Sequence, residues 1–306
     1  MSEGMSTWAL PEPEFVRLRW TLRFEAPFMA RGYLGSAFRG LLGHGLRQTA
    51  CVTRARECKG CLLMSSCVHA RLFEGGLKGG QVPYVLAPPV TRNQLFSPGD
   101  SFPLEMTLIS PAHKDLAYLV QAFQRAGKLG LGREHVPFSL DDLEWLDLES
   151  EAWNGLGSGG QVSLSVRAGR PTAPPVPSRV HVRLVTPLRL KRRKQLVGPR
   201  EFDSALLLEA LAYRSFAIAG QRPSKALLEA MRYAVRPVQG RLYWADWARY
   251  SSRQHTPMKV GGVMGEMVLD TTGLEPWWPM LWTGQWLHLG RFTSMGLGRY
   301  MLEKAQ

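Results

Sequence analysis

The sequence contains no uninterrupted apolar run of about 18 residues, the length that a membrane-spanning helix requires. The first residues, Met1 to Pro13, also lack the basic start and apolar middle of a secretory signal. These absences exclude an integral membrane helix and argue against export by such a signal. We therefore expect a cytoplasmic protein without a membrane partner.

Acidic residues are scarce relative to basic ones, with 25 Asp and Glu against 38 Lys and Arg and a net charge of +13. The excess is concentrated between Arg179 and Arg253, which hold 16 basic and 5 acidic residues. Such a stretch is typical of a polyanion-binding surface, for nucleic acid first and an anionic membrane surface second. The alternative is a solvated surface that only keeps the protein soluble. The apolar content of 45% is sufficient for a substantial core.

Cysteine is nearly absent, and the four that exist lie within seventeen residues, at Cys51, Cys58, Cys61 and Cys67. Their spacing, C-x6-C-x2-C-x5-C, includes the C-x2-C pair of a metal-binding turn. Because disulfides are disfavoured in a reducing cytoplasm, we expect a closed structural zinc site, with an iron–sulfur cluster as the second choice. His69 could replace one ligand, and four unliganded thiols are the remaining alternative.

The chain divides into two similar halves, 1–175 and 176–306. Apolar and polar residues alternate from Phe15 to Glu25 and again from Val180, which predicts a strand at the start of each half. Between them, Asn154 to Ser178 is rich first in Gly and Ser and then in Pro, which is typical of a loop and an extended linker. The sequence Gly-Leu-Gly-Arg recurs at 130–133 and 296–299, which indicates an internal duplication unless the match is chance.

Apolar periodicity predicts helices between these strands. The expected segments are Tyr33–Ala50, a helix around Leu116–Phe123, one capped by Asp203 and extending to Ile218, and one from Pro223 to Tyr233. Trp277 to Trp286 is expected to be helical and buried. This order predicts an α+β protein of two tandem ferredoxin-like, RNA-recognition-like domains with a C-terminal glycine-rich loop.

A helical projection of the first helix places His44 and Arg47 on its polar face, one turn apart. A histidine there could accept a proton from a ribose 2′-hydroxyl, and the arginine could stabilise charge on the scissile phosphate. The alternative is a solvent-facing histidine without a function. Gly40 and Gly43 beside them suggest close approach of either a ligand backbone or another helix. His288 is a minor catalytic alternative.

Three groups of residues are candidates for RNA contacts. Exposed charges are expected in the basic stretch, exposed backbone amides in the closing loop, and polar groups beside Trp244 and Trp247, two residues that could instead pack in the core. The candidates are Arg189, Lys191, Arg192, Arg193 and Lys194; Gly296, Gly298 and Arg299; and Arg249, Arg253 and His255.

Three ordered stretches resemble one family. They are FRGLLGHGLR at 38–47 with the cysteines and ARLFE at 70–74; RYSSRQ at 249–254 with GGVMG at 261–265; and the closing segment 290–300. Together they resemble the CRISPR-associated precursor-RNA-processing endoribonucleases of the RAMP superfamily, over about Phe15 to Leu302. The resemblance implies two ferredoxin-like domains in a prokaryotic cytoplasmic protein. It also implies CRISPR repeat RNA, or crRNA, as the partner, with other effector subunits as a second class.

The resemblance further implies metal-independent cleavage, in which the ribose 2′-oxygen attacks the adjacent phosphate and leaves a 2′,3′-cyclic phosphate and a 5′-hydroxyl. His44 matches the family's catalytic histidine on the first helix, and Tyr33 matches a tyrosine often used there. The usual catalytic lysine has no clear counterpart, so Arg47 or a charge from the second half is expected to replace it. A non-catalytic RAMP subunit that holds guide RNA is the main alternative, and a metalloprotein that binds RNA through its cysteines is a third.

Overall fold

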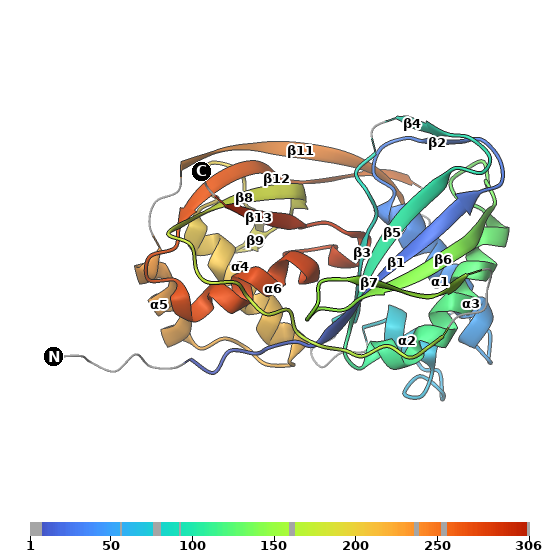
Figure 1. Cartoon of the computed structure of the whole chain (residues 1–306), viewed down its shortest axis with the longest axis horizontal. Coiled ribbons are helices and arrows are strands. Elements are labelled where there is room, and N and C mark those ends of the chain that lie inside the picture. The colour runs from blue at the N-terminus through green and yellow to red at the C-terminus, as the bar shows by residue number, and fades with distance from the viewer. Residues whose placement is uncertain are drawn as a thin grey trace.

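The computed structural model describes residues 8–55, 57–75, 81–91, 93–158, 163–235, 239–251 and 256–304. The two halves of the chain form two lobes side by side, each with an antiparallel sheet and covering helices (Figure 1). The protein is therefore α+β, as predicted. None of the described helices is both long and apolar enough to cross a membrane.

The first lobe is built on a five-stranded sheet in the order β3-β5-β1-β6-β7. Helices α1 and α3 pack on one face of this sheet, and Trp20, Phe38 and Phe123 are among the fully buried residues between them. The strands of the lobe are β1 (Phe15–Phe24), β2 (Phe28–Ala30), β3 (Tyr84–Ala87), β4 (Gln94–Phe96), β5 (Ser101–Ile109), β6 (Phe138–Leu146) and β7 (Trp153–Ser158). Its helices are α1 (Gly35–Ala50), α2 (Val68–Phe73), α3 (Leu116–Leu129) and the short η1 (Ala112–Asp115).

The second lobe has a four-stranded sheet in the order β11-β12-β8-β13. The predicted cap is present, since the Asp203 side chain accepts a hydrogen bond from the Leu206 amide at 2.8 Å. The strands are β8 (Arg179–Leu188), β9 (Lys191–Arg192), β10 (Gln195–Leu196), β11 (Gln239–Ser251), β12 (Thr256–Asp270) and β13 (Tyr300–Lys304). The helices are α4 (Ser204–Ile218), α5 (Lys225–Ala234), α6 (Trp278–Leu287) and the short η2 (Glu275–Trp277) and η3 (Thr293–Met295).

The two sheets have the same topology. In the first lobe β1 lies between β5 and β6, and β3 lies outside β5. In the second lobe β8 lies in the same way between β12 and β13, and β11 lies outside β12. This is the ferredoxin-like strand order. The repeated Gly-Leu-Gly also has the same backbone form in both lobes, with φ of 80° and 76° at Gly130 and Gly132 and 84° and 74° at Gly296 and Gly298. These matches support the predicted duplication, while the boundary at residue 175 stays a prediction.

Three local expectations were wrong. The segment expected to be a loop begins with a real strand, β7, which pairs with the edge of β6 and continues the sheet. The helix expected from Pro223 begins at Lys225 instead, because the Ser224 side chain caps it. Arg17, placed on the polar face of the first strand, is 4% exposed, because a neighbouring strand supplies Glu105 and Thr107 as hydrogen-bond partners.

The lobes share an apolar seam. Phe15 and Ile109 of the first lobe pack with Ile218 and Leu287 of the second. Polar contacts also cross the seam, including the hydrogen bond that the Thr107 hydroxyl donates to the Trp286 carbonyl at 3.0 Å. The end of α6 is therefore fixed against the first sheet.

Candidate functional site

Helix α1 presents His44 to solvent. The apolar stripe of the helix, which includes Phe38, Leu42 and Leu46, is fully buried on the sheet. His44 lies on the opposite face and is exposed, and Arg47 follows one turn later and is half-buried. The predicted helical phase is therefore confirmed, and the two side chains share one face.

The helix contains glycine where other helices come close. A Cβ on Gly43 would lie 2.5 Å from the Phe73 ring of α2, and one on Gly45 would lie 2.2 Å from the Ala122 carbonyl oxygen of α3. Of the two explanations for Gly43, close helix packing is the one that the contacts support. Gly45, which the sequence did not single out, fixes the separation of α1 and α3.

Tyr33 lies just before α1 and faces the second lobe. Its ring centroid is 4.7 Å from that of Trp247, and a Cβ on Gly296 would lie 1.9 Å from the hydroxyl oxygen. Burial raises the pKa of the Tyr33 hydroxyl well above its ordinary value. From the start of α1 to His44 the helix rises roughly 14 Å, so the structure does not bring Tyr33 and His44 together. The catalytic role of Tyr33 stays a prediction.

The closing segment 290–300 packs against the start of α1. Arg39 donates a hydrogen bond from Nε to the Ser294 hydroxyl at 3.2 Å, and a Cβ on Gly35 would lie 1.9 Å from the Met295 carbonyl oxygen. Arg39 also places its guanidinium 4.2 Å from the centroid of the Phe73 ring. Sequence reasoning missed Arg39, because its partners lie 34 and 255 residues away.

Gly296 and Gly298 of the closing segment are buried, so the exposed amides expected at these two residues are wrong. The Gly296 amide donates to the Thr293 carbonyl at 2.8 Å, and the Gly298 amide to the Pro187 carbonyl at 3.1 Å. The Thr186 hydroxyl donates to the Gly296 carbonyl and accepts from the Arg299 amide, both at 2.8 Å. Glycine is needed here for positive φ and close packing, and these amides do not face a ligand.

Arg299 belongs to a charged cluster at the seam, formed with Arg17, Arg19 and Glu105. Its guanidinium is 3.9 Å from the Glu105 carboxylate, and Arg19 is 3.6 Å from the same group. Burial lowers the pKa of Arg17. Burial would raise the pKa of Glu105, but Arg17, Arg299 and Arg19 lower it below its ordinary value. Arg299 therefore has an acidic partner and keeps 24% of its side chain exposed, and its contact with RNA stays a prediction.

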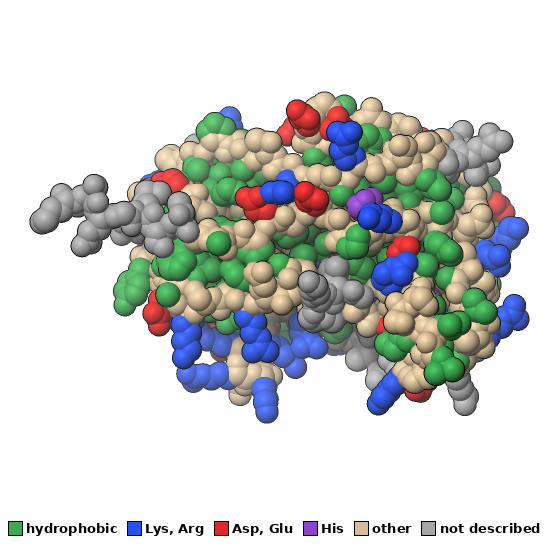
Figure 2. Space-filling view, turned by 90° about the horizontal axis from the view of Figure 1, so that it is seen from below, with side chains coloured by type: hydrophobic (Ala, Val, Ile, Leu, Met, Phe, Trp, Pro, Cys, Tyr) green, Lys and Arg blue, Asp and Glu red, His purple; other side chains and the backbone are tan. Residues whose placement is uncertain are grey.

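Four of the five expected basic residues form an exposed hairpin. Strands β9 and β10 pair, and Arg193 and Lys194 form the turn with φ of 49° and 70°. Lys191 to Lys194 are all exposed. Arg189 is instead half-buried and donates to the Gly261 carbonyl at 2.7 Å. Figure 2 shows Lys and Arg side chains gathered along the lower edge of the left-hand lobe, which is the second half of the chain.

The third predicted cluster is largely outside the described residues. Arg253 and His255 lie outside them, and Arg249 is described only as a backbone position in β11, paired with Met258. Trp244 is half-buried and donates its indole N–H to Asp246 at 2.9 Å, and Trp247 packs on Tyr33. Both indoles have partners within the protein, and stacking of either on an RNA base stays a prediction.

His288 is not a catalytic candidate. It ends α6 with φ of 52° and is 0% exposed. Burial lowers the pKa of His288 well below its ordinary value, and the positive charges of Arg299, Arg17 and Arg214 lower it further. A neutral, sealed imidazole cannot reach a ribose.

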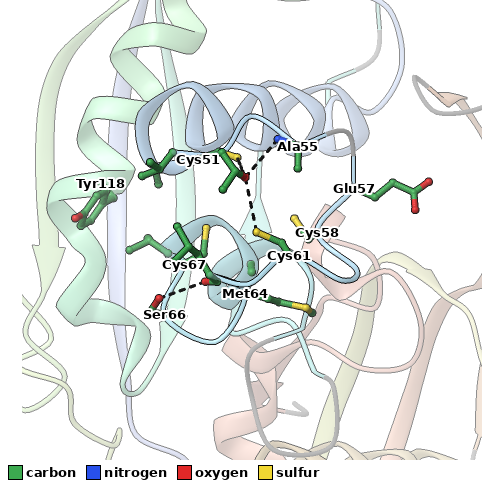
Figure 3. A pocket seen from close by; sticks show the side chains of 15 residues that line it. Cys51, Ala55, Glu57, Cys58, Cys61, Met64, Ser66, Cys67 and Tyr118 are labelled. Carbon is green, nitrogen blue, oxygen red and sulfur yellow. Dashed lines mark hydrogen bonds between the residues drawn. The ribbon is translucent and has the colours of Figure 1, made fainter.

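The four cysteines line one cavity below the end of α1 (Figure 3). Cys58 Sγ is 3.4 Å from Nδ1 of His69, and the Thr53 hydroxyl lies 3.9 Å from Cys51 Sγ and 3.7 Å from Cys61 Sγ. The donor set suits zinc. Within the described part of the chain, however, no three His, Cys, Asp or Glu side chains already converge as they would around a bound ion.

Two family models match the chain. A model described as an N-terminal domain matches residues 10–166, and the model of the CRISPR-associated endoribonuclease Cas6 matches residues 182–300. Comparison with curated protein sequences finds no match.

Solved Cas6 structures share the fold. A Cas6 product complex is 17% identical, with 95% of this chain and 99% of that chain covered and a TM-score of 0.58. Thermus thermophilus Cas6 is 15% identical, with the same coverage and a TM-score of 0.56. A chain of a partial Cas6-RT-Cas1–Cas2 complex is 16% identical, with 97% and 47% covered and a TM-score of 0.61. The present chain thus spans about half of that longer chain.

The second half of the chain thus matches a Cas6 model, and the chain shares the fold of solved Cas6 structures. The Cas6 model covers residues 182–300, less than half of the chain, and this match agrees with the resemblance seen in the sequence.

Proposed function

We propose that this chain cuts CRISPR repeat RNA within precursor crRNA to release mature guide RNAs. The observation that carries the proposal is His44, an exposed imidazole on the first helix of a chain whose second half matches the Cas6 model. The match to the Cas6 endoribonuclease model suggests the reaction class. Exposure of the imidazole, on a helix fixed on both sides by packing, supports His44 as the group that performs proton transfer.

The proposed reaction is a transesterification within the RNA. The ribose 2′-oxygen loses its proton and bonds to the adjacent phosphorus, while the bond from phosphorus to the 5′-oxygen breaks and that oxygen takes up a proton. The products are a 2′,3′-cyclic phosphate and a 5′-hydroxyl. An imidazole can accept or donate a proton near neutral pH, so His44 suits either transfer.

No metal is required by this scheme, because the nucleophile is supplied by the substrate. The developing phosphorane charge needs a cation, and Arg47, one turn from His44, is the first candidate. Because Arg47 is half-buried, basic side chains of the second lobe can supply part of the positive charge that the phosphorane needs.

The exposed hairpin Lys191–Lys194 is proposed to hold the RNA backbone. Four adjacent cations in solvent form a strong electrostatic contact with phosphates, and their contribution depends on salt. The partner is CRISPR repeat RNA or its crRNA product, with other CRISPR effector subunits as a second class.

A cleavage assay tests the enzyme. Purified protein is incubated with repeat RNA in EDTA, and the product ends are mapped. We expect a single cut with a 2′,3′-cyclic phosphate, and no cut when a 2′-deoxynucleotide stands at the scissile position. Cleavage of the deoxy substrate would refute attack by the 2′-oxygen, and cleavage only with added metal would refute metal independence.

Matched histidine variants test the residue. His44→Ala is expected to lose at least about 100-fold in cleavage rate and to keep its RNA affinity. His135→Asn, at another exposed histidine, is expected to cleave normally. If the wild-type protein binds repeat RNA and does not cleave it, the chain is instead a non-catalytic RAMP subunit that holds guide RNA.

A further inference from the structure

The segment between α1 and α2 has no hydrophobic core of its own. From Cys51 to Cys67, no side chain that the structure describes is buried. The large apolar side chains point to solvent, with Val52 82% and Leu62 97% exposed. The half-buried side chains are those of the four cysteines and Ala55. Apolar burial therefore cannot fix this segment, and the groups that face inward are almost all thiols.

The thiols are placed at structural junctions. Cys51 is the residue that ends α1, and Cys67 is the residue that precedes α2. Cys58 and Cys61 lie on the turn between them, where the Cys61 amide donates to the Cys58 carbonyl at 3.1 Å. All four line a single cavity of about 200 Å³, large enough for several water molecules.

His69 already lies within hydrogen-bond distance of Cys58. The separation of Cys58 Sγ and His69 Nδ1 is 3.4 Å. His69 is 3% exposed and lies on α2, so its ring is fixed against the cavity.

We propose that this segment binds one structural zinc ion through the thiolates of Cys51, Cys58, Cys61 and Cys67, and that His69 supports Cys58 by donating its ring N–H to that sulfur. The ion draws the thiolates toward the centre of the cavity. It thereby joins the end of α1 to the start of α2 and replaces the core that the segment lacks.

The bound zinc ion would also position helix α1. α2 places Phe73 against Gly43, the neighbour of His44. Fixing the start of α2 to the end of α1 therefore fixes the contact beside the imidazole. A metal-free protein keeps the sheet and α3 contacts of α1, but loses the restraint at its C-terminal end.

Metal analysis of the purified full chain tests the proposal. We expect one zinc per chain, retained through gel filtration and released by a chelator with a fall in the unfolding temperature. Replacement with Co²⁺ is expected to give the thiolate charge-transfer and tetrahedral d–d absorption bands of four sulfur ligands. Both measurements use the wild-type protein and do not depend on the folding of a variant.

Variants separate the ligands from the segment. Cys58→Ser and Cys61→Ser are expected to bind less than a tenth of a zinc per chain, while Leu62→Ser, an exposed change on the same turn, keeps a full equivalent. His69→Gln is expected to weaken zinc about 10- to 100-fold. Absorption near 400 nm with bound iron, disulfide-bonded cysteines in protein purified under reducing conditions, or the absence of any metal would each overturn the proposal.

Discussion

His288 makes the stability of the protein depend on pH in a calculable way. The imidazole is 0% exposed at the end of α6, and burial lowers its pKa well below the ordinary value, with Arg299, Arg17 and Arg214 acting in the same direction. In the unfolded chain the same group titrates near its reference pKa of about 6.5. Below that pH the unfolded chain binds one more proton than the native protein.

Stability therefore falls as pH falls. Above pH 6.5 both states hold a neutral His288, and its contribution is fully present. Below it, the free energy of unfolding decreases by about 1.4 kcal/mol per pH unit until the native group protonates. From pH 7.5 to 5.0 the loss from this one group amounts to about 2 kcal/mol. His69 and His113, whose pKa values are also lowered by burial, add losses of the same sign.

Chemical denaturation followed by tryptophan fluorescence measures the effect between pH 7.5 and 5.0. Below pH 6.5 we expect His288→Asn to reduce the slope of the free energy of unfolding against pH by the equivalent of one proton, because asparagine does not titrate. Asparagine also tolerates the positive φ at this position. His135→Asn is the matched control, since His135 also has a positive φ, 50°, but is exposed. If wild type and His288→Asn have equal slopes, the native imidazole protonates without cost and the reasoning is refuted.

Three further changes have defined outcomes. Gly45→Ala, whose Cβ would lie 2.2 Å from a carbonyl oxygen of α3, is expected to lose about 1–3 kcal/mol in urea unfolding, and unchanged stability would show that the helices separate freely. Arg17→Met removes a buried partner of Glu105 and is expected to lose about 3 kcal/mol, partly recovered when Glu105→Gln is added. The double variant Arg193→Asn/Lys194→Gly relieves two positive-φ positions and is expected to stabilise the fold by about 1 kcal/mol. It also removes two cations, so the slope of log affinity for single-stranded RNA against log salt concentration is expected to fall by about 1.4. An unchanged slope would show that the hairpin is not part of the RNA interface.

Local pattern was sufficient for most of the secondary structure. Alternation predicted β1 and β8, apolar periodicity predicted α1, α3 and α4, and a capping aspartate placed the start of α4. The exposure of His44 also follows from helical phase alone. Each of these features is decided by residues within one or two turns of the position concerned.

The remaining features depend on partners distant in sequence. Arg17 is buried because Glu105 comes alongside it in the sheet, and Tyr33 is covered by Trp247 and Gly296 from the other lobe. His288 was a minor catalytic alternative in the sequence, but it is buried and its ring lies against the backbone of Leu297 in the closing segment. An alternating pattern or a glycine count cannot identify such partners, so burial at the seam was the part that the sequence did not predict.

The position of His44 has consequences for both proposals. The start of α1 is held by the second lobe, through Arg39 with Ser294 and through Gly35 against Met295. Its end leads into the cysteine segment, and its middle contacts α2 and α3. The position of the His44 imidazole therefore depends on the second lobe at the start of α1 and on the cysteine segment at its end. Disturbing either attachment should therefore lower the cleavage rate more than RNA affinity, since the proposed phosphate contacts lie on the separate hairpin Lys191–Lys194.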